Sequence, residues 1–152
     1  SFCDRTLEAY GKHFTFGDVV RASRLALDEG VYYAHFLILG GYGDTRENVR
    51  ETIENSRRME YTVMFPYAGM RIYPHTRLAE LAAKEGAIGR DDDLMAPSYY
   101  ISRDFDLEEV RRAALATGKA WVFPDDPQSA LADTLRLKRN KKGPLWEYLR
   151  KP

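Results

Sequence analysis

The sequence predicts an α/β fold in which helices flank a parallel sheet and a mainly helical extension follows. Residues 31–39 are apolar on both alternating sets of positions except at His35, which is typical of a strand covered on both faces. Amphipathic helical patterns precede and follow this strand. A second strand region lies at residues 61–73, and another helical pattern comes after it. This alternation is typical of βαβ units that build a parallel sheet.

Two helices are expected before the first strand. Asp4 is placed to cap a short helix that ends at Gly11, and a longer helix runs from about Gly17 to Glu29. The inward face of the longer helix is expected to consist of Val19, Ala22, Leu25 and Ala26. The helix after the strand spans residues 45–59, and its expected inward face consists of Val49, Ile53 and Met59.

The second strand region is interrupted by Pro66 and Gly69. Because proline cannot donate to a strand ladder, we expect a bent first part and a regular strand only at residues 68–72. Thr76 is placed to cap the next helix, which ends at Gly86.

The character of the chain changes after this helix. Loops separate two further helices, expected at residues 106–117 and 126–139. We therefore divide the chain into βα units at residues 1–90 and a helical extension at residues 91–152.

Composition excludes several classes of protein. The chain has 152 residues, of which 44% are hydrophobic, and 23 basic residues balance 23 acidic ones. Because no bulk charge attracts nucleic acid or an anionic membrane, the basic run at residues 138–142 is interpreted as a solvated helix end. Cys3 is the only cysteine, which excludes an internal disulfide and fits a cytoplasmic location. No apolar run approaches the ~20 residues of a membrane span.

The corner after the first strand is the strongest candidate site. Gly40, Gly41 and Gly43 let the backbone approach a ligand closely, and Asp44 and Thr45 can cap the helix that follows. Such a corner presents free N–H groups to an anionic ligand. The structural alternative is a tight strand-to-helix connection without a ligand.

Three segments resemble the radical S-adenosylmethionine (radical SAM) enzymes. Leu39-Gly40-Gly41-Tyr42-Gly43-Asp44-Thr45 resembles the Gly-x-Pro-Gly-Glu-Thr corner after the fifth barrel strand. Met70-Arg71-Ile72-Tyr73-Pro74-His75-Thr76 resembles the sixth strand with its Tyr-Pro-Gly-Thr continuation. Asp4-Arg5-Thr6-Leu7, with Gly11-Lys12, resembles the segment after the fourth strand.

These matches lie in the first 90 or so residues. The remaining third is more loosely similar to the C-terminal extensions of cobalamin-linked members, at Tyr99-Tyr100-Ile101-Ser102 and Gly143-Pro144-Leu145-Trp146.

The chain also departs from the family pattern. The cluster motif Cys-x3-Cys-x2-Cys is absent, and Cys3 alone cannot hold an iron-sulfur cluster. Tyr42 replaces a proline, Asp44 a glutamate and His75 a glycine, and there is no cobalamin-type Asp-x-His-x-x-Gly motif. We interpret the chain as the C-terminal half of a longer enzyme, cut near the end of the fourth strand.

The resemblance implies a partial TIM-barrel-like architecture and a set of cofactor contacts. Ile38 and Gly40, then Met70, Arg71 and Ile72, would hold the adenine of S-adenosylmethionine. The corner residues Gly41, Gly43 and Asp44 complete the implied set.

The resemblance places the [4Fe-4S] cluster on the absent half, so this chain would be inactive alone. In the family, the reduced cluster cleaves the cofactor to a 5′-deoxyadenosyl radical that abstracts hydrogen from the substrate. The resemblance does not identify the catalytic residues or decide whether cobalamin is used. It also leaves the substrate open, as a small molecule or a lipid-like compound.

Other residues admit a functional and a structural interpretation. Arg71 can bind a carboxylate or phosphate of a ligand, or pair with a neighbouring acid. His75 is interpreted as a solvent-facing cap, His35 as a satisfied core or helix-facing residue, and residues 91–93 as solvated acids rather than metal ligands. Tyr99, Tyr100 and Trp146 either cover a pocket or close the core.

Two other functions stay open. The chain could be a non-catalytic interaction module whose exposed sheet edges pair with a partner or with a second copy. It could also be a nucleotide-binding α/β domain, although Gly40-Gly41-Tyr42-Gly43 is not the Gly-x-Gly-x-x-Gly pattern.

Overall fold

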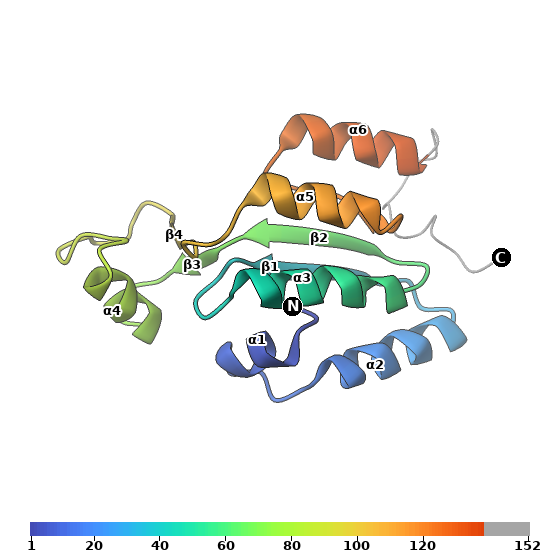
Figure 1. The fold of residues 1–152 in the computed structure, drawn as a ribbon, viewed down its shortest axis with the longest axis horizontal. Coiled ribbons are helices and arrows are strands. Elements are labelled where there is room, and N and C mark those ends of the chain that lie inside the picture. Colours follow the sequence, from blue (N-terminus) through green and yellow to red (C-terminus); the bar gives the residue numbers. More distant parts are fainter. Residues whose placement is uncertain (139–152) are drawn as a thin grey trace.

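The computed structural model describes residues 1–138, except for the side chains of residues 129, 133 and 136–138 (Figure 1). Two sheets are present in this part of the chain. The parallel sheet has the order β1-β2-β5 and consists of β1 (Ala34–Leu39), β2 (Val63–Ala68) and β5 (Ala120–Trp121). An antiparallel pair joins β3 (Met70–Ile72) to β4 (Ser98–Tyr100). The fold is α/β, as predicted.

Helices connect these strands. They are α1 (Asp4–Ala9), α2 (Phe16–Asp28), α3 (Arg46–Asn55), α4 (Arg77–Lys84), α5 (Leu107–Ala116) and α6 (Pro127–Lys138), with a 3-10 turn at Ser56–Arg58. The predicted caps Thr45, Thr76 and Asp106 each accept a hydrogen bond from a backbone N–H of their helix. The predicted extension also contains β4 and β5, which pair with β3 and β2.

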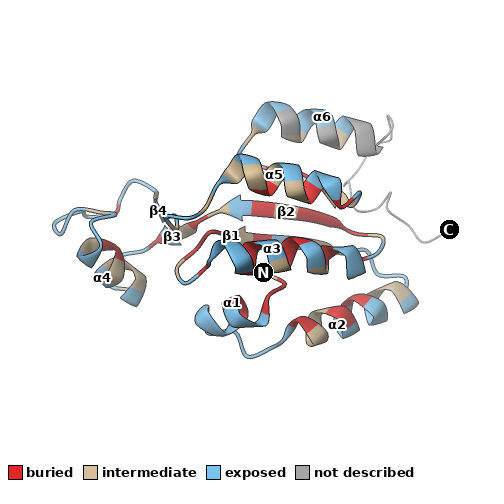
Figure 2. Ribbon diagram, viewed as in Figure 1, coloured by how far each residue is buried: buried red, intermediate tan, exposed pale blue. Residues whose placement is uncertain are grey.

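The main core lies on one face of the parallel sheet. Leu37 and Leu39 of β1, Met64 of β2 and Trp121 of β5 form one cluster with buried residues of three helices. The contributions of α2, α3 and α5 are Phe16, Val20, Val49, Ile53, Val110 and Ala114. These helices therefore cover the same face, and Figure 2 shows their buried stripes.

The opposite face of the sheet is only partly covered. Val63 and Val122 are buried there, and Ala130 of α6 packs against them. Phe36 of β1 is 63% exposed and Tyr67 of β2 is 41% exposed. We call this side the open face.

Helix α2 is rotated relative to the predicted orientation. Its buried residues are Phe16, Val20 and Ser23, whereas Ala22 is exposed and Leu25 is 62% exposed. The predicted inward face was wrong for Ala22 and Leu25. The helix is apolar over more of its surface than β1 alone can cover, so the periodicity could not determine which half is buried.

The longer regular strand is β2, which ends at Ala68, so the prediction of only a bent first part before residue 68 was wrong. The predicted strand at residues 68–72 is present in part, as the short β3 at Met70–Ile72. Met64 carbonyl oxygen accepts the N–H of Val122, so the main-chain groups of Met64 face β5. Two residues on, Pro66 faces the same way beyond the end of β5, where no ladder donor is needed. Gly69, with a φ of 75°, then redirects the chain into β3.

Asp4 does not cap α1. The N-cap residue is Cys3, and Asp4 Oδ1 accepts the N–H of Phe16 at 2.6 Å, at the start of α2. That helix begins with a capping box between Thr15 and Asp18. Asp4 therefore joins two helices instead of starting one.

Candidate functional site

The glycine corner connects β1 to α3 as predicted. Gly40 and Gly43 have φ angles of 71° and 80°, in the left-handed region that favours glycine. Thr45 then caps α3, and its Oγ1 accepts the N–H of Asn48 at 3.2 Å. The corner thus has the left-handed glycines and the helix cap that the sequence predicted.

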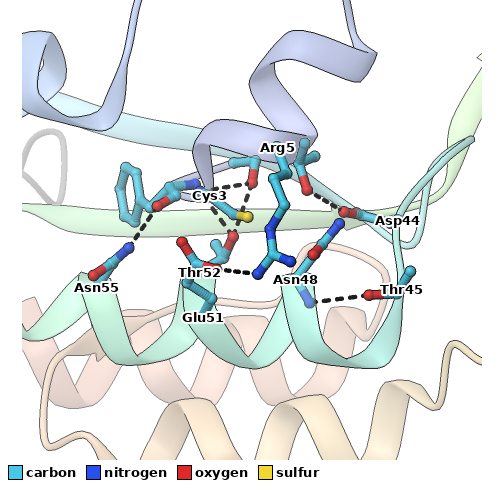
Figure 3. Close-up of polar contacts among 11 residues, drawn as sticks. Cys3, Arg5, Asp44, Thr45, Asn48, Glu51, Thr52 and Asn55 are labelled. Carbon is cyan, nitrogen blue, oxygen red and sulfur yellow. Dashed lines mark hydrogen bonds and ion pairs between the residues drawn. The ribbon is translucent and has the colours of Figure 1, made fainter.

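Asp44 is committed to contacts within the chain. It is 7% exposed, and its carboxylate accepts hydrogen bonds from Thr6 Oγ1 at 2.6 Å, Tyr10 Oη at 3.0 Å and Gly40 N at 2.9 Å. Burial and the Asp44 carboxylate raise the pKa of Tyr10, which keeps its hydroxyl a donor. Asp44 therefore fastens α1 to the corner (Figure 3).

The glycines of the corner permit close packing of other parts of the chain. A Cβ atom at Gly40 would lie 2.4 Å from the Phe105 ring, and one at Gly41 would lie 2.4 Å from Tyr10 Oη and 2.6 Å from Met70 Cγ. The carbonyl of Gly40 also accepts the N–H of Ser102 at 2.8 Å. The main-chain N–H and C=O of Gly40 are thus both bonded within the chain.

Ile38 lies apart from this packed region. It is half-buried on the open face and pairs in register with Tyr67. The Phe36 ring stacks on Phe65 at 5.1 Å and on Tyr67 at 6.4 Å between centroids. Ile38 and these rings offer an apolar surface to the flat face of a ligand.

The β3 residues divide between the interior and the surface. Ile72 is buried and belongs to a small second core that also contains Ala82, Leu94 and Tyr100. Met70 is half-buried and packs toward Gly41. Of the predicted cofactor contacts, the structure brings Gly40, Gly41, Asp44 and Met70 into one packed corner, and it leaves Ile38 and Arg71 accessible.

Arg71 is exposed on β3. Its guanidinium carbon lies 4.9 Å from the centre of the Tyr73 ring, and its register partner on β4 is the exposed Tyr99. None of the side chains that the structure describes forms an ion pair with Arg71. The guanidinium is therefore available to an anion from outside.

The other candidate residues have structural surroundings. His75 has a φ of 59° and immediately precedes Thr76, which caps α4. The Asp92 and Asp93 carboxylates accept the backbone N–H groups of Leu94 and Met95. Among the described residues, no group of three or more His, Cys, Asp or Glu side chains is placed to hold a metal ion.

The two adjacent tyrosines have different roles. Tyr100 is buried and its hydroxyl donates to Glu85 at 2.8 Å, so it closes the second core, while Tyr99 is 53% exposed. Trp146, the segment at residues 143–146 and residues 139–142 lie outside the described residues.

His35 faces the helices, as predicted. Its ring lies edge-on to Phe2 at 5.0 Å, and its Nε2 is 3.5 Å from Ser23 Oγ. Burial, together with the charge of the Ser1 amino group, lowers the pKa of His35 to about 4. His35 is therefore neutral at pH 7.

Sequence reasoning missed the contacts of the first residues with α3 (Figure 3). Ser1 Oγ lies 2.8 Å from Thr52 Oγ1, Asn55 Nδ2 donates to the Phe2 carbonyl at 2.8 Å, and Arg5 pairs with Glu51 at 3.1 Å. The partners are about 50 residues apart in the sequence. No local sequence pattern could therefore predict these contacts.

Comparisons of this chain with protein families, with curated proteins and with solved structures find no match. Within residues 1–138 no helix has the length and apolar character that crossing a bilayer requires.

Proposed function

We propose that this chain is the C-terminal part of a radical SAM enzyme, in which it forms the adenine-side wall of the cofactor site and part of the substrate pocket. The observation that carries the proposal is the packing of α2, α3 and α5 on a single face of the parallel sheet. In a (βα) barrel the crossover helices all lie on the outer face of the sheet, whereas doubly wound folds place crossover helices on both faces. Helix α6, which contacts the open face at Ala130, follows the last described strand and is not a crossover helix.

On this proposal the open face corresponds to the barrel interior. Ile38, Phe36, Phe65 and Tyr67 are the residues that would line it, and barrel sites lie at the carboxyl ends of the strands. The Gly40 corner and β3 follow those ends of β1 and β2. The exposed Arg71 would meet an anionic group of the cofactor or substrate.

The described residues fit part of the cofactor. Ile38 and Tyr67 can pack against adenine, but the N–H and C=O of Gly40 are used by Asp44 and Ser102. We therefore assign the adenine contact to side chains of the open face instead of the Gly40 backbone. Three thiolates are needed for the family's cluster, and this chain has only Cys3, which is buried.

When bound, the cluster and S-adenosylmethionine supply radical chemistry, and the protein positions and shields the reactants. This chain's contribution would be an apolar wall and a guanidinium, so we propose that it has no activity alone.

The test uses the longer protein from which this sequence comes. Reconstituted with iron and sulfide, it should bind a [4Fe-4S] cluster and release 5′-deoxyadenosine from S-adenosylmethionine. Ile38→Ala should weaken cofactor binding about tenfold, which corresponds to ~1.4 kcal/mol of lost apolar contact. Val31→Ala is the control, because Val31 is exposed and lies before β1.

An upstream sequence without the three cysteines, or a reconstituted protein that forms no 5′-deoxyadenosine, would refute the radical SAM assignment. A non-catalytic interaction module is the second candidate, because the outer edge of β1 is not paired with any described strand.

A further inference from the structure

Within the described part of the chain, no strand pairs with the outer edge of β1. The Leu39 carbonyl accepts the N–H of Gly69, so the main-chain groups of alternate residues 35, 37 and 39 face β2. The main-chain groups of Ala34, Phe36 and Ile38 then face the other side, where no described strand lies. This side is an edge that can accept another strand.

The edge lacks the features that normally prevent pairing. Exposed edge strands are usually protected by lysines, prolines or bulges. Residues 31–39 contain no charged residue, proline or glycine, and the only titratable side chain within β1 itself is His35. An uncharged edge with the exposed Phe36 is therefore suited to a permanent strand partner.

An apolar groove runs beside the same edge. It has a volume of about 400 Å³ and is bordered by α2 and the start of β1, and its lining includes Phe14, Val19, Ala22, Ala26, Tyr33 and His35. Val19, Ala22 and Ala26 belong to the face of α2 that the sequence predicted to be buried, whereas Leu25 of that face does not line the groove. A crossover helix normally packs against both of the strands that it connects. Helix α2 meets β1 through Ser23 and His35, and no described strand lies on the other side of β1.

The handedness of the crossovers determines where the missing strand lies. The β1-α3-β2 connection has its helix on the covered face and moves from β1 toward β2. Parallel crossovers in a sheet are right-handed in nearly all cases. Because α2 lies on the same face, the strand before it must lie on the side of β1 opposite β2.

We propose that residues N-terminal to Ser1 in the longer protein form a parallel β-strand that pairs with the outer edge of β1 and fills the groove beside α2. This inference deepens the proposed function, but it depends on only one part of it, namely that the chain continues an α/β sheet. Ser1 lies on the covered face of the sheet, where its Oγ contacts Thr52 of α3.

Ala22→Glu distinguishes an open groove from a filled one. In the 152-residue chain Ala22 is exposed, so the melting temperature should hardly change. In the longer protein the carboxylate would be buried under the strand, and the melting temperature should fall by about 5 °C or more. Ala132→Glu is the matched control, because Ala132 is also an exposed alanine within a helix and should be neutral in both proteins.

Amide hydrogen exchange gives an independent measurement on unsubstituted proteins. The N–H groups of Phe36 and Ile38 should exchange rapidly in the 152-residue chain and about 100-fold more slowly in the longer protein. The N–H of Leu37 faces β2 and should be protected in both.

Equal exchange at Phe36 and Ile38 in the two proteins, or an equal effect of Ala22→Glu, would overturn the proposal. It would also be overturned if a second copy of the chain occupied the edge, which light scattering of the 152-residue chain would reveal, or if no coding sequence precedes Ser1. If the strand pairs with β1 but the longer protein forms no 5′-deoxyadenosine, the inference about the strand is supported and only the proposed radical SAM function is refuted.

Discussion

The carboxyl end of β1 and its outer edge differ in how fully their polar groups are hydrogen-bonded and their apolar groups are packed. At the carboxyl end, Asp44 accepts three hydrogen bonds and the glycines admit Phe105, Tyr10 and Met70 at close range. At the outer edge, main-chain groups and the groove beside α2 have no cover among the described residues. The polar groups of the glycine corner, the more conspicuous feature of the sequence, are therefore bonded within this chain, whereas the outer edge of β1 lacks hydrogen-bond partners and packing among the described residues.

The largest expected effect tests the close packing at the corner. Gly40→Ala combines a left-handed backbone with a Cβ placed 2.4 Å from the Phe105 ring, and we expect a loss of about 4 kcal/mol in unfolding free energy. Gly86→Ala is the control, because Gly86 has a similar φ of 76° with no atom within 4 Å, and it should cost only ~1 kcal/mol. Urea denaturation measures both. Equal losses would mean that the contact with Phe105 does not constrain Gly40.

Asp44→Ala tests the polar side of the same corner. It removes the acceptor of Thr6, Tyr10 and Gly40, and buried donors without acceptors cost about 3 kcal/mol together. Asp93→Ala, at a loop position with one bond to Met95, should cost less than ~1 kcal/mol. If the two variants were equally stable in urea, the hydrogen bonds of Asp44 would not be what holds α1 against the corner.

His35 makes the groove side sensitive to acid. Its pKa is lowered from 6.5 to about 4, chiefly by burial, so the unfolded chain binds its proton more tightly than the folded chain. Stability should therefore be complete above pH 6.5 and fall as the pH drops toward 4, by about 2 kcal/mol between pH 7 and pH 5. His35→Gln should flatten this part of the profile of unfolding free energy against pH.

His75→Gln is the control for that experiment, because it makes the same substitution at an exposed histidine outside the groove. A slope between pH 7 and pH 5 that persists in His35→Gln would assign the acid sensitivity to other groups.

The smallest expected effect concerns the exposed guanidinium. Arg71→Ala removes a stacking contact with Tyr73 at the surface, so the unfolding free energy should change by about 0.5 kcal/mol or less. In the longer enzyme the same variant should weaken binding of an anionic ligand, measured by titration calorimetry. A large loss of stability would show that Arg71 has a structural role instead.

Local sequence patterns predicted much of the fold. The first strand has the uniform apolar pattern of a covered strand, and the caps at Thr45, Thr76 and Asp106 are local side-chain-to-backbone contacts that the sequence displays directly. The strands β4 and β5 could not be predicted, since two or three residues carry no readable periodicity. Pro66 led to a wrong prediction because a proline is tolerated in β2 only where β5 no longer needs a hydrogen-bond donor. The position at which β5 ends is a property of the tertiary structure.

The candidate site was less predictable than the fold. The glycine corner was located correctly. The atoms that fill it come from Tyr10, Met70 and Phe105, each of which lies 29 to 65 residues away in the sequence from the glycine that it contacts. The spacing of Thr6 and Tyr10, one helical turn apart, is the single local signal that both could reach Asp44.

The second core, made of Ile72, Ala82, Leu94 and Tyr100, is small and separate from the main one. Few backbone bonds join the two regions, and those that do include the contacts of Gly69 with Leu39 and of Ser102 with Gly40. Proteins open in cooperative units whose stability follows the apolar area that each buries. The amides of the β3-β4 pair and α4 should therefore exchange with solvent at a lower opening free energy than those of the parallel sheet.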